Sequence, residues 1–324
     1  MERKNYDTLL FGNGLTIALF NKINEKTQVE EFNSFFKNFL FLSFTDKKDF
    51  YKILYSSKDS DVYLEANDIK KIEAFLIENL DNIISNGFEV WIGEKAFTAN
   101  VSLVKDTTCY YLALFNYWFN LLDLSNYAIC ESINLCASSF KKLGITDVYT
   151  LNYDTFLDKA FETKHIHGSF LDSFDNLRQM AHFRYENSSN ITEFLYPFCA
   201  ETNGFAKLSA LYKLYKANVS GYDYSFLFSQ NTSYGNLLIY GIRFADSLII
   251  PDIIKNKYKD KDIRLMQYVD GHIILRLEAL YNANQIDSIT IAYYSDEDLE
   301  RYKRVLKKCE FYKIVKYVRS SDVF

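Results

Sequence analysis

The feature that most limits how this chain can fold is a set of short apolar segments, each followed by a glycine or a polar turn. Their apolar residues do not alternate strictly with polar ones, which is typical of parallel strands buried on both faces. Gly12 follows the first of these segments, and Asn152 follows the second. Because open α/β sheets bind ligands at the carboxyl ends of their strands, such turns are candidate binding positions. The strand-like segments cover residues 8–11, 148–151, 237–240, 289–294 and 312–318.

Helical periodicity fills much of the chain between these segments. The clearest pattern covers residues 67–86, where apolar residues share one face and Gly87 follows. Another runs over residues 127–142 and stops before Gly144, a residue suited to the left-handed cap of a helix. Alternation of strands and helices predicts an α/β fold, a Rossmann-like parallel sheet with helices on both faces. Further helices are expected near residues 15–20, 154–161, 205–217, 270–282 and 296–308.

The length and composition favour one compact body. The chain has 324 residues, of which 48% are hydrophobic, enough for a sizeable core. It has two prolines and no linker rich in glycine and serine, so we expect a single domain over residues 1–324. A large helical insert is expected at about residues 24–145, between the first and second strands. A second, smaller insert is expected at about residues 170–232.

Charge and cysteine usage exclude several classes of protein. A net charge of −5 without a basic stripe argues against a nucleic-acid partner. Five cysteines without a Cys-x-x-Cys pair argue against a disulfide framework and structural zinc, and they indicate reduced thiols in the cytoplasm. No secretory signal is recognisable at the N-terminus. The most apolar stretch, residues 109–124, is too short to cross a bilayer, so no membrane partner is expected.

The first candidate site is Gly12-Asn13-Gly14, which follows a strand and precedes a helix. The first glycine permits a tight turn, and the second lets the backbone approach a pyrophosphate at the helix N-terminus. The third glycine of the usual dinucleotide pattern is missing, since Ile17 and Ala18 occupy that region. By itself this motif fits a phosphate-binding turn and an ordinary turn about equally.

The second candidate site is Asn152-Tyr153-Asp154, after the strand at residues 148–151. In one interpretation Asn152 or Asp154 only caps the following helix. In the other, an amide and a carboxylate meet ribose hydroxyls and an attacking nucleophile. Taken alone, the motif favours the cap.

The third candidate site is His165-Ile166-His167-Gly168. The two histidines alternate on a strand and therefore point to opposite faces. His167, beside Gly168, is the one expected to face a pocket, and His165 is expected to be structural. No spacing of cysteine or carboxylate completes a metal site, so no metal is predicted.

Taken in this order, the three motifs give the chain a resemblance to the sirtuin-like superfamily of NAD-consuming proteins. Members of that superfamily carry a glycine-rich turn after the first strand, an Asn-x-Asp after a middle strand and a His-Gly soon after. The segment 237–241 resembles the later strand and glycine that line the same crevice. The matching residues are Gly12, Gly14, Asn152, Asp154, His167 and Gly168.

The departures from the family pattern narrow the resemblance. The zinc-binding cysteine pairs of protein-deacylating sirtuins are absent, as is the extension of their first motif. Long helical segments stand in their place. The chain therefore resembles the divergent bacterial branch that includes NAD-hydrolysing effectors of anti-phage defence.

The resemblance implies an NAD hydrolase that releases nicotinamide and ADP-ribose. Asn152 would orient ribose or water, His167 would accept a proton, and Asp154 would hold the ribose or Asn152 in place. A free NAD hydrolase harms its own cell, so we expect inactivity until a homo-oligomer forms, a small signal binds, or an activating partner such as a phage protein arrives. The residues expected to bind NAD, the small-molecule substrate, are Gly12, Asn13, Gly14, Tyr153, Gly168, Gly241 and Ser295.

Two other functions fit the same motifs. A non-catalytic module could bind NAD or another nucleotide and regulate a partner through the helical insert. An ADP-ribosyl transferase or a deacylase would use the pocket with an acceptor other than water, although the missing zinc pairs count against deacylation.

Overall fold

The computed structural model describes most of the N-terminal half of the chain and its C-terminal end. Three expected site residues, Tyr153, His167 and Gly168, lie outside the described residues. So do the smaller insert expected at residues 170–232 and the helix within it. The described residues are 6–24, 30–56, 66–95, 101–122, 126–152, 154–158, 160–165, 233–244 and 271–324.

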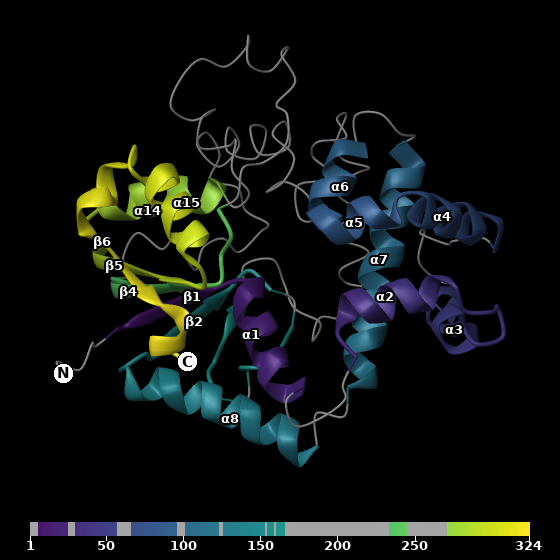
Figure 1. The fold of residues 1–324 in the computed structure, drawn as a ribbon, viewed down its shortest axis with the longest axis horizontal. Helices are drawn as coiled ribbons and strands as arrows, with labels where there is room; N and C mark the ends of the chain where they lie inside the picture. The colour runs from purple at the N-terminus through teal and green to yellow at the C-terminus, as the bar shows by residue number, and fades with distance from the viewer. Residues whose placement is uncertain are drawn as a thin grey trace, which may run out of the picture.

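The described strands form one parallel sheet in the order β3-β2-β1-β4-β5-β6 (Figure 1). Strand β1 lies at its centre, paired with β2 on one side and β4 on the other. The expected Rossmann-like α/β fold is therefore confirmed. The strands are β1 (Thr8–Phe11), β2 (Asp147–Thr150), β3 (Lys164–His165), β4 (Gly235–Tyr240), β5 (Ile286–Tyr293) and β6 (Val315–Arg319).

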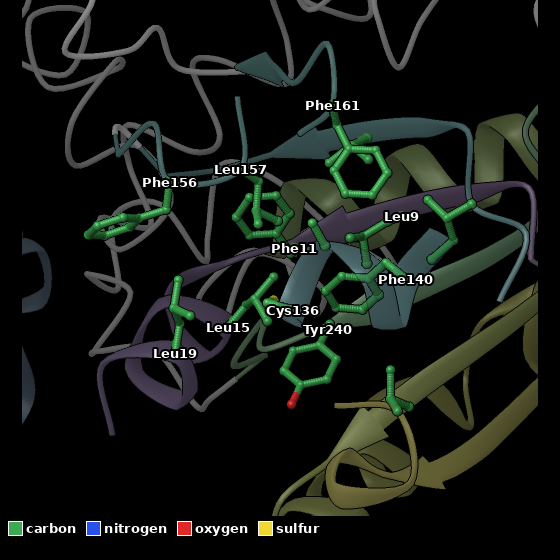
Figure 2. Close-up of a cluster of buried hydrophobic side chains, with 14 of the residues drawn as sticks. Leu9, Phe11, Leu15, Leu19, Cys136, Phe140, Phe156, Leu157, Phe161 and Tyr240 are labelled. Carbon is green, nitrogen blue, oxygen red and sulfur yellow. The ribbon is translucent and has the colours of Figure 1, made fainter. Parts of the chain in front are cut away.

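Helices cover both faces of the sheet, which explains why its central strands are apolar throughout. Leu9 and Phe11 point to a core shared with α1 (Asn13–Asn24) and α8 (Tyr127–Lys142), as Figure 2 shows. Leu10, between them, joins the opposite core. That core includes side chains of α14 (Gly271–Asn282) and α15 (Asp296–Leu306). Successive residues of a strand face opposite sides, so each needs an apolar partner.

The helical insert follows α1 and has a hydrophobic core of its own, separate from the two cores on the sheet. In Figure 1 its helices stand to one side of the sheet. Near the end of α7, Trp118 and Phe119 instead join the core around α1 and α8. The insert helices are α2 (Phe32–Leu40), α3 (Lys48–Ser56), α4 (Ala66–Glu78), α5 (Leu80–Asn86), α6 (Phe88–Lys95) and α7 (Val101–Leu121). Among the described helices, none is long and apolar enough to span a membrane.

Two predicted element boundaries were wrong. The single helix expected at residues 67–86 is divided between α4 and α5 at Asn79. The Asn79 side chain donates a 2.8 Å hydrogen bond to the Phe75 carbonyl, which is the kind of local bond that competes with helix formation. Tyr312 lies in a 3₁₀ helix, η2 (Glu310–Ile314), so the last strand starts later than expected.

The helix expected at residues 154–161 was also wrong, because the described residues there form turns. Phe156, Leu157 and Phe161 are buried in the core beside α1 and α8 (Figure 2). These three apolar residues have a spacing that a buried helix would also show, which explains the wrong prediction. This turn segment anchors the loop that carries Asn152 and Asp154.

Candidate functional site

The order of the strands places one switch point in the sheet, between β1 and β4. The chain runs from β1 toward β2 and β3 on one side, and it continues from β4 toward β5 and β6 on the other. In open α/β sheets the crevice outside the carboxyl ends of the strands at such a point is where ligands bind. Gly12 follows β1, Gly14 lies in the first turn of α1, and Gly241 follows β4, so the structure brings these three expected site residues together.

The two turns touch through their backbones. The Gly12 amide donates to the Tyr240 carbonyl at 3.0 Å, and the Gly14 amide donates to the Gly241 carbonyl at 2.9 Å. A Cβ added to Gly14 would lie 2.6 Å from the Gly241 Cα. Gly241 itself has a φ of 70°, in the region that favours glycine. The glycines therefore permit close packing of the β1 and β4 turns, and the amides of Gly12 and Gly14 are used in joining them.

The residues around this junction come from two more elements. Asn13 is exposed at the first position of α1. From the end of β5, the Tyr294 hydroxyl donates a 2.6 Å hydrogen bond to the Gly14 carbonyl, so its ring reaches past the β4 turn. The Ser295 hydroxyl accepts the Asp298 amide hydrogen at 3.2 Å and caps α15. Ser295 thus has a structural role beside the switch point.

A buried polar cluster lies next to the junction, at the carboxyl end of β2. The Asn152 side-chain amide donates to the Thr16 hydroxyl at 2.9 Å and to the Asp154 carboxylate at 3.1 Å. The Thr16 hydroxyl donates to the same carboxylate oxygen at 2.7 Å. Asn152 and Asp154 are both buried. The first turn of α1 and the loop after β2 are therefore joined through one carboxylate oxygen.

Burial raises the pKa of the Asp154 carboxyl above its usual value. Hydrogen bonds from Thr16, from the Phe156 amide and from Asn152 favour the ionised form, as does the nearby His165, but they offset only part of this effect. Asp154 is thus a carboxyl group whose charge is costly in the folded state, which is a common property of functional sites.

His165, on β3, contacts the same loop from the other side. Its Nδ1 lies 2.9 Å from the Asn152 carbonyl oxygen, and its Nε2 lies 3.1 Å from each carboxylate oxygen of Asp158. Burial lowers the pKa of His165, but the contacts with Asp158 and the Asn152 carbonyl outweigh this, and the net shift is upward. The structure therefore gives His165 a direct contact with a candidate catalytic residue.

Thr16 and Asp158 are part of this site but lie outside the three motifs recognised in the sequence. Thr16 follows Gly14 by two residues in a helix whose neighbouring positions are apolar. A polar residue in this apolar context, just after the glycine turn, is the feature of the sequence that indicates a place in the site. Asp158 lies in the segment predicted to be a helix and belongs to none of the three sequence motifs.

Comparison with protein-family models, with curated proteins and with solved structures gives no match for this chain. The described ranges contain no group of three or more histidine, cysteine, aspartate or glutamate side chains placed to hold a metal ion. The switch-point turns and the polar cluster beside them are therefore the features of the described residues that bear on function.

Proposed function

We propose that the protein hydrolyses NAD at the bond between nicotinamide and ribose. One observation carries the proposal. The buried amide of Asn152, the buried carboxyl group of Asp154 and the partly buried hydroxyl of Thr16 form a hydrogen-bonded cluster beside the switch point between β1 and β4. The ordered motifs that resemble sirtuin-like NAD-consuming proteins support the same substrate.

The chemistry needs positioned dipoles more than a strong acid. Nicotinamide leaves as a neutral ring when its bond to ribose C1′ breaks and the electron pair stays on its nitrogen. Water supplies the oxygen that bonds to C1′, and its proton passes to His167, which we propose as the base because the pKa of a histidine is about 6.5. Hydrogen bonds to the ribose hydroxyls strengthen as positive charge develops on the sugar.

Asn152 is the group proposed to act on ribose or water. Asp154 and Thr16 fix the orientation of its amide through the three hydrogen bonds that join them. A fixed amide loses little entropy when substrate binds, which is how a preorganised site lowers a barrier. The nucleotide would lie against the junction of Gly14 and Gly241, with Asn13 at its exposed edge.

Asn152→Ala tests the proposal against a matched control, Asn236→Ala. Asn236 also lies in a hydrogen-bonded cluster, with Asp7 and Ser288, but near the amino ends of the strands, away from the proposed site. Purified variants are incubated with NAD, and nicotinamide and ADP-ribose are measured by chromatography. We expect Asn152→Ala to lose at least about 10²-fold in turnover and Asn236→Ala to keep it.

Three outcomes would contradict this proposal. Equal turnover in the wild type and Asn152→Ala would exclude Asn152 from the reaction. No nicotinamide release by the wild type, with or without an added activating partner, would exclude NAD hydrolysis. An increase in mass on a second protein in place of free ADP-ribose would indicate transfer to an acceptor other than water.

A second candidate is a nucleotide-binding module that regulates a partner through the helical insert. It is favoured by the loop between α2 and α3, where Phe41 and Phe44 are 64% and 67% exposed. Exposed apolar side chains close together are typical of surfaces that contact other molecules. Tight NAD binding without turnover in the presence of the partner would support this function over hydrolysis.

A further inference from the structure

The contacts of His165 point to a role beyond that of a buried structural histidine. We propose that His165, in its protonated form and paired with Asp158, is a positioning residue that holds the loop of Asn152 in its working conformation. This inference rests on the proposed function, in which Asn152 acts on ribose or water. It assigns His165 no direct contact with the substrate.

Both ring nitrogens of His165 face hydrogen-bond acceptors. Nδ1 lies 2.9 Å from the carbonyl oxygen of Asn152, which can only accept. Nε2 lies 3.1 Å from both oxygens of Asp158. A neutral imidazole has one donor and one acceptor nitrogen, so it can satisfy only one of these contacts. The imidazolium satisfies both.

The charged groups around the ring favour the same state. Asp158, on the turn after β2, is the nearest carboxylate. The carboxyl group of Asp154, in the polar cluster with Asn152, also favours the positive charge on the ring. Lys164, the neighbour on β3, instead forms an ion pair with Asp147 at 3.2 Å and contacts the Tyr149 hydroxyl. Burial disfavours the proton on His165, whereas the Asp158 carboxylate, the Asn152 carbonyl and the Asp154 carboxyl group favour it and outweigh the burial.

Loss of the proton would release one of the two contacts. The hydrogen bond to a carboxylate is the stronger kind, so the neutral ring keeps its proton on Nε2, toward Asp158. Nδ1 then presents a lone pair to the Asn152 carbonyl, and the two repel. Deprotonation of His165 thus loosens the main chain of the residue whose side chain is proposed to act on NAD.

The sign of the pH effect follows from the upward shift in the pKa of His165. The stabilisation is fully present below the unfolded value of about 6.5, and it is lost as the pH rises through the folded pKa. NAD turnover should therefore fall on the alkaline side as His165 loses its proton.

Asp158→Asn tests whether His165 positions the Asn152 loop or only packs against it. The amide of an asparagine at position 158 donates to Nε2, so the neutral ring can carry its proton on Nδ1 and keep the bond to Asn152. We expect the alkaline fall in turnover to disappear in Asp158→Asn. His165→Asn, which offers a donor near the position of Nδ1, should keep part of the turnover and show no alkaline fall, whereas His165→Ala should lose most of it.

The readout that does not need activity is nuclear magnetic resonance of the full chain with labelled histidine and asparagine. The Asn152 amide signal, assigned by its loss in Asn152→Asp, should titrate together with the His165 ring in the wild type and stay constant in Asp158→Asn. A His165 pKa at or below about 6.5, or an Asn152 signal that ignores the titration, would overturn the positioning role. Absence of nicotinamide release with both signals coupled would instead count against NAD hydrolysis.

Discussion

Gly14 and Gly241 approach so closely that neither can carry a side chain in this arrangement. A Cβ on Gly14 would lie 2.6 Å from the Gly241 Cα, and one on Gly241 would lie 2.5 Å from the Leu15 nitrogen. The turn after β1 and the turn after β4 therefore meet backbone to backbone. Since β1 and β4 border the switch point, this contact sets the floor of the proposed nucleotide site.

Gly14→Ala should destabilise the fold, although the same change within a helix normally stabilises it. Gly14 is the second residue of α1, where alanine has the better helix propensity. The clash with Gly241 should outweigh that gain and cost about 1–3 kcal/mol. Urea unfolding measures the change. Ile17→Ala, at a position of the same helix that is 59% exposed, is the control and should change stability little. A more stable Gly14→Ala protein would contradict the close contact.

Thr16→Val should impair the proposed site while Thr16→Ser preserves it. Valine keeps the shape but removes the hydroxyl that joins Asn152 to Asp154, leaving a carboxylate oxygen with one donor fewer. A loss of about 1–3 kcal/mol in stability is expected, with NAD turnover reduced by up to about 10²-fold. Serine restores the hydrogen bonds. Equal turnover in the two variants would show that the hydroxyl does not orient Asn152.

Asp154→Asn should change how stability depends on pH. Because burial raises the pKa of Asp154, its contribution is fully present below the unfolded value of about 3.9 and is lost as the pH rises through the folded pKa. The stability of the wild type relative to Asp154→Asn should therefore fall as the pH rises through that range. Urea unfolding at several pH values from 3 to 7 measures the difference.

Asp49→Asn is the matched control for this measurement. The pKa of the exposed Asp49 is lowered by the hydrogen bond and charge of Lys52, so its contribution is present at higher pH and is lost on acidification. Its pH slope should have the opposite sign and a small size. Slopes of the same sign in both variants would refute the assigned environment of Asp154.

Lys47→Met should weaken the helical insert. Lys47 is 3% exposed, and its ammonium group lies 3.0 Å from Glu73, whose other carboxylate oxygen accepts hydrogen bonds from Tyr51 and Tyr110. Removal of the lysine leaves a largely buried carboxylate without its counter-charge, a change that typically costs about 3–5 kcal/mol. Hydrogen exchange of α3 and α4 should accelerate. Lys52→Met, which breaks a surface pair with Asp49, should leave exchange unchanged.

The fold was predictable wherever the buried residues recur with the period of the helix or strand that contains them. Strand β1 and helix α8 were predicted with the bounds that the structure has, because their apolar residues and end signals belong to the same few residues. Residues 154–161 were misread, since Phe156, Leu157 and Phe161 are buried from a turn and not from a helix. An apolar residue indicates that a position is buried, but it does not indicate which backbone conformation buries it.

The pattern of residues along the chain is enough to predict that apolar strands and helices alternate and that glycine or polar turns follow those strands. The folded chain adds contacts that no local pattern predicts: Gly14 meets Gly241, Thr16 shares a carboxylate oxygen with Asn152, and His165 contacts the Asn152 carbonyl. These contacts join residues that are 13 to 227 positions apart along the chain. Spacing along a sequence sets local geometry, whereas the order of strands in the sheet sets which of the remote turns become neighbours.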